Sequence, residues 1–261
     1  MTREKPVDPY AVTDSPEETA RLERTWHSPG GLLGWFTHVN QRMIGKRFII
    51  TAFIFFILAG ILGILIRLQL AGPEQQFIGP ELYNQFFTMH GTVMMFFFAI
   101  PVMEGFAIYF VPLMVGTRDM AFPRLNAFGY YVYLIGGIVL FGSLLLSMAP
   151  NAGWFNYVPL SSKLYSPGYG VDVWTTMITF IEVSALTAAV ELIVTTLRMR
   201  APGMSLNRMP LFVWAALVMS FMIVFAMPAV IVSSTLLILD RLVDTQFFIV
   251  ESGGEPLLWQ H

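Results

Sequence analysis

The sequence predicts an all-α fold, a polytopic membrane helix bundle with five transmembrane helices. Of its 261 residues, 56% are apolar and only 12% are charged. A soluble core of this size would leave much apolar surface in water, so a lipid environment explains the composition. The chain has no cysteine, which excludes disulfides, thiolate metal clusters and thioether-linked cofactors.

Five apolar runs are long enough to cross a hydrocarbon layer, which takes about 20 helical residues. They lie near residues 46–70, 86–113, 127–149, 173–197 and 212–238. Polar or Pro/Gly-rich connectors separate them, and no soluble domain intervenes. We therefore divide the chain into a tail with an amphipathic segment (1–45), the five-helix part (46–238) and an outer-side segment (239–261).

The positive charges predict the orientation of the spans. With a cytoplasmic N-terminus, three of the 15 Lys and Arg residues, namely Arg67, Lys163 and Arg241, fall on the outer side. The other twelve fall in the tail, around the start of the first span, and around two loops on the inner side. Cytoplasmic segments carry an excess of Lys and Arg, so we expect a bacterial inner-membrane protein whose N-terminus is cytoplasmic.

His90 and Arg67 are polar residues near the expected outer ends of two spans. His90 is expected about 6 Å below the outer end of the second span, and Arg67 closes the first span after about 31 Å of helix. Position alone leaves His90 open between a hydrogen bond to a neighbouring helix and a metal or heme ligand. Arg67 either marks the helix end or donates to a polar group at the depth of His90.

Three glutamates lie within the spans, where an ionised carboxylate is costly. Glu104 lies about 27 Å from the outer end of its span and Glu191 at a similar depth, so we expect both to approach the cytoplasmic interface. Glu182 is nearer the membrane centre. Glu182 and Glu191 are about 900° apart on their helix, so they do not form a paired-carboxylate site. Asp119 is either a solvated loop acid or a proton-collecting group at the cytoplasmic mouth.

Several collinear strings resemble subunit I of the heme–copper oxidases, most closely the cytochrome c oxidase branch. The resemblance runs from about Asn40 to His261. It rests on Leu65-Ile-Arg67, Tyr83-Asn-Gln-Phe-Phe-Thr-Met-His-Gly91, Val111-Pro-Leu-Met-Val-Gly116, Asp119-Met-Ala-Phe-Pro-Arg-Leu-Asn126, Gly153-Trp154, Arg200-Ala-Pro-Gly-Met204, Pro210-Leu-Phe-Val-Trp214 and Gly253-Gly-Glu-Pro-Leu-Leu-Trp-Gln-His261.

The resemblance implies a role for each matching residue. It makes His90 an axial ligand of the low-spin heme iron and Arg67 the arginine that hydrogen-bonds the formyl group of heme A. Trp154 matches a tryptophan near the edge of the same heme. Asp119 matches the acid at the entrance of a proton-uptake channel, and Asn126 a polar residue that lines it. An arginine beside a conjugated carbonyl would tune the heme potential.

The sequence departs from the family within that proton channel. Ile108, Ala127 and Phe48 stand where the family commonly has two asparagines and a tyrosine. We therefore hypothesise a rerouted proton path through Glu104 and Glu191.

A second departure is length. The resemblance ends at the approach to a sixth span of an expected twelve-helix subunit. The copper ligands and the remaining heme ligands of the family lie beyond it, so no catalytic residue of oxygen reduction is expected within these residues. The high-spin heme and copper are expected only in a full-length subunit, and we favour a truncated sequence or an incomplete gene over a split subunit.

The resemblance implies a proton-pumping terminal oxidase that passes electrons from cytochrome c to oxygen. Its expected partners are oxidase subunits II and III, cytochrome c and the lipid bilayer, without nucleic acid. Two alternatives remain: a proton-coupled transporter, suggested by the three intramembrane glutamates, and a heme-free structural or assembly paralog. The expected transporter features, inverted repeats or broken helices, are not evident in the sequence.

Overall fold

The structure is a computed structural model that describes residues 15–26 and 30–260. The chain divides into two compact units, residues 1–38 and 39–261. In the first unit, α1 spans Pro16–Trp26 and α2 spans Gly31–Thr37. The amphipathic segment of the sequence prediction is thus helical. Leu32 and Leu33 on α2 are 80% and 71% exposed, which leaves an apolar surface on this short helix.

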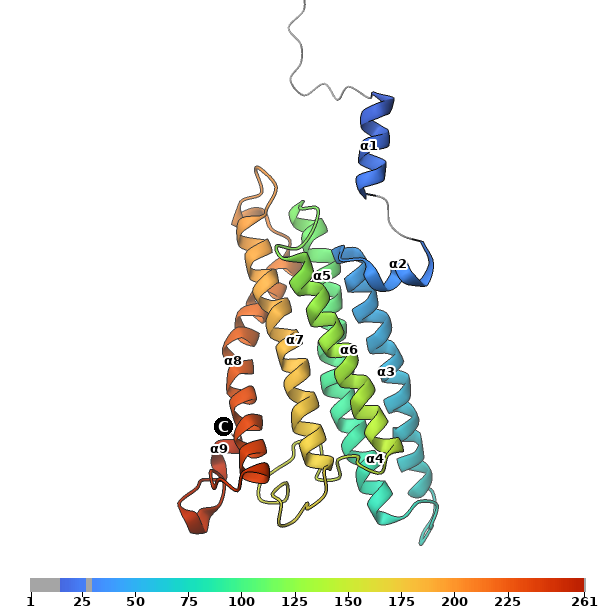
Figure 1. Cartoon of the computed structure of the whole chain (residues 1–261), viewed down its shortest axis with the longest axis vertical. Coiled ribbons are helices and arrows are strands. Elements are labelled where there is room, and N and C mark those ends of the chain that lie inside the picture. Colours follow the sequence, from blue (N-terminus) through green and yellow to red (C-terminus); the bar gives the residue numbers. More distant parts are fainter. Residues whose placement is uncertain (1–14, 27–29, 261) are drawn as a thin grey trace, which may run out of the picture. The chain divides into compact units, whose positions relative to one another are not determined.

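The second unit contains five helices that are long and apolar enough to cross a membrane. They are α3 (Gln41–Gln69), a composite helix over Pro80–Val115, α6 (Pro123–Leu145), α7 (Gly170–Arg198) and α8 (Leu211–Leu242). The five run roughly alongside one another (Figure 1). The short helix η2 (Leu206–Arg208) lies between α7 and α8, and η3 (Val250–Ser252) and α9 (Leu257–Gln260) follow α8. The predicted all-α bundle of five spans is confirmed among the described residues.

Three of the spans begin several residues before the apolar runs that predicted them. The first starts at Gln41, where the Asn40 side chain accepts a hydrogen bond from the Arg42 N–H and caps the helix. Pro80 and Pro123 stand in the first turn of the second and third spans, where a proline costs no helical hydrogen bond. Polar residues at helix starts are invisible to a hydropathy criterion, so the apolar runs underestimated these spans.

The second span consists of three segments. It combines α4 (Pro80–Thr92), the wide π-helical turn η1 (Val93–Ala99) and α5 (Ile100–Val115). Gly116 ends it in the left-handed conformation, with φ of 77°, which a residue without a Cβ adopts at little cost. The sequence prediction treated this span as a regular helix and did not foresee the wide turn.

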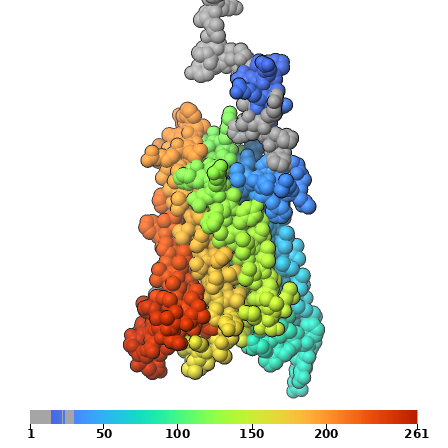
Figure 2. All heavy atoms as spheres, viewed as in Figure 1, coloured from blue at the N-terminus to red at the C-terminus, as the bar shows by residue number. Residues whose placement is uncertain are grey.

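Close contact between α3 and α5 depends on two glycines. A Cβ on Gly45 would lie 3.0 Å from the Gly105 carbonyl oxygen, and a Cβ on Gly105 would lie 3.1 Å from the Gly45 carbonyl oxygen. Small residues let helix backbones approach in membranes, where van der Waals packing replaces the hydrophobic effect between helices. Elsewhere large side chains fill the interior, and α6 and α7 pack side by side along their length (Figures 1 and 2).

Arg241, near the end of α8, ties together the end of the bundle at which α7 begins and α8 ends. Its Nε and one terminal nitrogen donate to the two carboxylate oxygens of Asp172 on α7, at 2.7 and 3.0 Å. Its guanidinium also donates to the carbonyls of Ser161, Ser166 and Gly168. The buried cation is thus fully paired, and it joins α7, α8 and the loop between α6 and α7.

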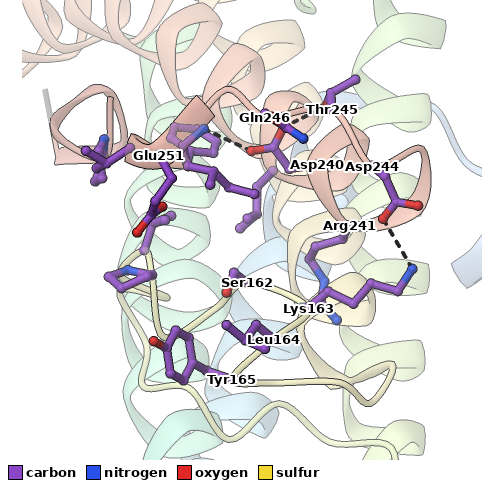
Figure 3. Close-up of a pocket in the computed structure, with 17 residues that line it drawn as sticks. Ser162, Lys163, Leu164, Tyr165, Asp240, Arg241, Asp244, Thr245, Gln246 and Glu251 are labelled. Carbon is purple, nitrogen blue, oxygen red and sulfur yellow. Dashed lines mark hydrogen bonds and ion pairs between the residues drawn. The ribbon is translucent and has the colours of Figure 1, made fainter. Parts of the chain in front are cut away.

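A cavity of about 500 Å³ lies beside Arg241 at the same end of the bundle. Its wall includes the exposed ion pair of Lys163 and Asp244, 3.5 Å apart, and Asp240, which accepts a hydrogen bond from the Thr245 hydroxyl (Figure 3). Asp240 also accepts hydrogen bonds from two backbone N–H groups, so it organises the turn after α8. The polar groups of this cavity serve the local fold.

We predict that Asp172→Ala destabilises the bundle by about 3 kcal/mol, because it leaves the buried Arg241 cation without its carboxylate. Thermal unfolding in detergent, followed by near-ultraviolet circular dichroism, measures the loss. Lys163→Ala is the control, since it breaks an ion pair whose side chains are 58% and 78% exposed. Its effect should stay within the small range of surface pairs. Equal effects of the two substitutions would contradict this role of Arg241.

Candidate functional site

A groove of about 520 Å³ runs along the bundle between α3 and α4. Its lining is mostly apolar and includes one histidine and one arginine. The lining residues are Gly60, Gly63, Ile64, Ile66, Arg67, Leu68, Phe87 and His90. The structure therefore brings together the two polar residues that the sequence analysis selected in the first two spans.

His90 is held in this groove by a hydrogen bond to the α3 backbone. Its Nδ1 lies 2.8 Å from the carbonyl oxygen of Ala59. A carbonyl only accepts, so Nδ1 carries the proton and, in the neutral ring, Nε2 keeps a lone pair. This is the arrangement that orients a metal-ligating histidine. His90 lies ten residues into α4, about 15 Å from its start, which corrects the expected 6 Å because the helix begins at Pro80.

Gly63 makes room for the imidazole of His90. A Cβ at position 63 would lie 2.9 Å from Cε1 and 3.2 Å from Nδ1 of that ring, closer than real Cβ contacts. One turn earlier, a Cβ on Gly60 would meet open space. The groove face of α3 thus has a strip without side chains, beside which a flat molecule can lie. Arg67 follows on the same helix, with an exposed side chain.

Trp154 lies beside a different part of α4. A Cβ on Gly91 would lie 2.8 Å from the Trp154 ring, so the indole packs directly on that helix next to His90. It lines a separate cavity of about 380 Å³ together with Phe96 and Trp174. The structure therefore brings Trp154 close to the backbone of His90 but not into the groove with Arg67.

Two threonines of α4 hold this helix to the loop between α6 and α7 and to α7 itself. The Thr88 hydroxyl accepts a hydrogen bond at 2.9 Å from the N–H of Gly153, the neighbour of Trp154. The Thr92 hydroxyl accepts one at 2.9 Å from the indole N–H of Trp174 on α7. Both threonines are fully buried. His90 therefore stands on a helix that is held from three directions.

Asp119 caps the other end of the bundle. One of its carboxylate oxygens accepts hydrogen bonds from the N–H of Met120 at 2.8 Å and of Gln41 at 3.1 Å. Burial raises the pKa of the Asp119 carboxyl, and these two N–H groups oppose that rise. The loop acid thus joins the start of α3 to the loop between α5 and α6, and it holds a proton to higher pH than a free aspartate.

Asn126 and Glu191 lie close to this acid. The Asn126 side chain is 2% exposed, and its amide nitrogen has no hydrogen-bond partner among the described residues. Glu191 is fully buried, and the charge of Asp119 acts on it electrostatically. One turn beyond Glu191, the Thr195 hydroxyl accepts from the N–H of Ala121, which fixes α7 to the same loop. Three of the proposed proton-pathway residues are thus neighbours.

Glu104 lies deeper in the bundle than expected. It is 1% exposed and precedes the end of its span by 11 residues, about 17 Å of helix. Glu182 on α7 is also 1% exposed. Within the described part of the chain, neither carboxyl oxygen of Glu104 or Glu182 has a hydrogen-bond partner, whereas the Glu191 carboxyl faces the backbone N–H of Asn126. The expected approach of Glu104 and Glu191 to a solvated interface is wrong, because side chains of the bundle cover both.

Arg47 is an interior residue that the sequence analysis assigned to the basic inner side. It lies on α3, is 0% exposed, and its guanidinium carbon is 5.8 Å from the ring centre of Tyr130. The face of the ring attracts the arginine charge in a cation–π contact. The Tyr130 hydroxyl pairs with that of Thr51 at 3.1 Å. Its place as the second residue of the apolar run 46–70 was the available signal for its burial.

Comparison with known proteins identifies the family. The pattern that defines cytochrome c and quinol oxidase polypeptide I matches residues 43–261. The chain belongs to this family. It is 40% identical over 95% of its length to a putative cytochrome c oxidase subunit 1-beta of Streptomyces avermitilis, 44% of which it covers. It thus spans under half the length of such curated relatives.

Relatives with other printed names show similar identity. A heme-copper oxidase subunit I+III of Aeropyrum pernix is 40% identical over 87% of the chain, which covers 28% of that protein. A quinol oxidase subunit 1 of Bacillus spizizenii is 39% identical over 86% of the chain, which covers 35% of that protein. The family and the five apolar helices together make this a multi-pass membrane protein.

We predict that Gly63→Val displaces the His90 ring and costs about 1–3 kcal/mol, the usual effect of overpacking. The ¹⁵N resonance of His90 Nδ1 reports the loss of its hydrogen bond to Ala59, and thermal unfolding reports the cost. Gly142→Val on α6 is the matched control, because a Cβ there meets nothing within 4 Å. An unchanged His90 resonance in Gly63→Val would show that the glycine is not needed for the ring.

Proposed function

We propose that this chain is the heme-binding N-terminal part of the catalytic subunit of a proton-pumping terminal oxidase. The parent subunit would pass electrons from cytochrome c to O₂, reduce it to water, and move protons across a bacterial inner membrane. The observation that carries the proposal is the His90 Nδ1 hydrogen bond to Ala59, which leaves Nε2 free within an apolar groove. Membership of the oxidase family supports it.

The residues of the groove fit a low-spin heme A. His90 Nε2 would be one axial ligand, and Gly60, where a Cβ would meet open space, leaves room for a flat macrocycle. Arg67 would donate to a formyl group and place a positive charge beside the heme ring. Trp154, which packs on Gly91 next to His90, would lie near the heme edge. When bound, heme supplies one-electron transfer, while His90 and Arg67 hold it and set its electrostatic environment.

The remaining cofactors and partners of the proposal belong to the assembled oxidase. High-spin heme and copper would be bound by the rest of the full-length subunit. Among the described residues, no cluster of three His, Asp or Glu side chains is placed to hold a metal ion. We propose oxidase subunits II and III as partners and cytochrome c as the donor. Because the relatives include a quinol oxidase, turnover rates measured with cytochrome c and with a quinol decide which is the donor.

The proposed proton pathway starts at Asp119. This carboxyl would take up a proton at the cytoplasmic end and pass it toward Asn126 and Glu191, to which it is close. Glu104 would hold a proton deeper in the bundle, next to Tyr133, on whose hydroxyl its charge acts. A carboxyl without a hydrogen-bond partner in a low-dielectric interior is more stable with a proton than without one. That property suits a group that loads and releases protons.

The charge distribution supports the proposed orientation. The ends of the spans that carry Arg118, Arg124, Arg198, Arg200 and Arg208 lie on the side of Asp119. The opposite end holds Arg67, Lys163 and Arg241, and the last of these is neutralised by Asp172. The excess of arginine favours a cytoplasmic location for the Asp119 side and hence for the N-terminus.

We predict that His90→Ala removes the low-spin heme band from the visible and magnetic circular dichroism spectra of the purified protein. Loss of an axial ligand should weaken heme binding by more than about a hundredfold, beyond the effect of second-layer residues. His38→Ala, which alters a histidine outside the groove, should keep the band. Absence of heme from the wild-type protein would favour the transporter or the heme-free paralog. An unchanged band in His90→Ala would reject the ligand assignment.

We predict that Glu104→Gln and Glu191→Gln each slow turnover by at least about tenfold or lower the number of protons pumped per electron. The amide keeps the shape of the side chain but cannot carry the proton. Oxygen consumption and proton release by the reconstituted oxidase measure the two quantities. Glu251→Gln, at an exposed carboxyl on the opposite side, serves as the control. Normal pumping in both interior variants would rule out a route through these glutamates.

A further inference from the structure

The wide turn η1 in the second span leaves an irregular backbone at membrane depth. At its end, the N–H of Ile100 donates to the carbonyl of Met95, five residues earlier. Pro101 follows directly and has no N–H, so it cannot donate to the carbonyls one turn before it. In a bilayer such a carbonyl needs another donor, because no water is available to provide one.

Tyr133 on α6 provides that donor. Its hydroxyl donates to the carbonyl of Phe97 in η1 at 2.9 Å, and the residue is 0% exposed. The Tyr133 ring also stacks on Phe97, with ring centres 6.1 Å apart, and on Phe48 of α3, with ring centres 5.4 Å apart. The hydroxyl therefore fixes the wide turn to α6, while its ring is held from both sides.

The same turn packs on the part of α3 that holds His90. The Phe97 ring lies edge-on against Phe55, with ring centres 5.7 Å apart. Phe55 precedes Ala59 by one helical turn, and the Ala59 carbonyl accepts the hydrogen bond from His90. The second span thus contacts α3 through His90 and Phe97, and a rotation at η1 would move both contacts.

We propose that Tyr133 is a positioning residue of the His90 site. Its hydroxyl holds the wide turn in one conformation. In that conformation, α4 is rotated so that His90 faces the backbone of α3. Because heme at His90 is itself part of the proposed function, the test includes a measurement that needs no heme.

A competing role for the same hydroxyl is proton transfer to Glu104. Tyr133 lies near this carboxyl, but its hydroxyl proton is directed to the Phe97 carbonyl. A proton-transfer role would change turnover and leave the orientation of His90 unaltered. A positioning role changes the orientation of His90 even in the resting protein.

Tyr133→Phe tests the proposal, because it removes the hydroxyl and keeps the ring. We expect the heme dissociation constant to rise about tenfold, as for other residues that orient a ligand, with a shifted low-spin electron paramagnetic resonance signal. In heme-depleted protein, the ¹⁵N resonance of His90 Nδ1 should also move. Tyr130→Phe is the matched control on the same helix, α6. It removes a hydroxyl that pairs with Thr51 of α3 and should leave both signals in place.

A second variant keeps the test decisive if Tyr133→Phe does not fold. A fluorinated tyrosine at position 133 retains the hydroxyl as a stronger donor, and it should shift the His90 resonance, whereas the same residue at position 130 should not. An unmoved His90 resonance in every position-133 variant that folds overturns the proposal. An equal shift from the same change at position 130 overturns it too. A wild-type protein without heme defeats the heme assignment alone, and the ¹⁵N measurement then decides the role of Tyr133.

Discussion

The hydrogen bond from His90 Nδ1 to the Ala59 carbonyl is the contact on which the candidate site depends. It fixes the tautomer of the ring, leaves the other nitrogen with a lone pair, and joins the first two spans. The contact forms only because Gly63 leaves its place open for the imidazole. A backbone carbonyl is present whichever side chain stands at its position, so substitution at residue 59 does not remove the acceptor. The identity of residue 63, rather than that of residue 59, is therefore the sequence requirement.

The fold was largely predictable from hydropathy, because a bilayer leaves a chain few ways to satisfy its backbone. Five apolar runs predicted five spans, and their family resemblance selected His90 and Arg67. The helix starts at Gln41, Pro80 and Pro123 were missed because the first turns of these helices hold polar residues and prolines. The wide turn at Val93–Ala99 was missed because an apolar run gives no sign of a π-helical turn, and the contact of its Phe97 carbonyl with Tyr133 joins segments distant in the sequence.

The interior polar residues were recognised but not correctly located. Distances along a helix placed Glu104 and Glu191 near the membrane–water interface, but both side chains are buried. The position of a residue along one helix does not show which neighbouring helices cover its side chain. The same limit applies to Arg47 and Arg241, which charge counting treats as equivalent to any surface arginine. One packs over Tyr130 and the other binds Asp172 and three carbonyls, and both depend on segments distant in the sequence. Pairwise geometry, which a single sequence does not contain, decides these cases.

The network around Arg241 also bears on the order in which the protein is assembled during synthesis. The carbonyls of Ser161, Ser166 and Gly168 leave the ribosome long before their donor, and Asp172 precedes it by 69 residues. The part of the loop between α6 and α7 that holds these carbonyls therefore lacks its cation until α8 has been inserted. Insertion of α8 is then the event that completes this end of the bundle, whereas Gly153, in the same loop, can already bond to Thr88 of α4. A bundle interrupted before α8 would leave Asp172 and the three carbonyls without their shared donor.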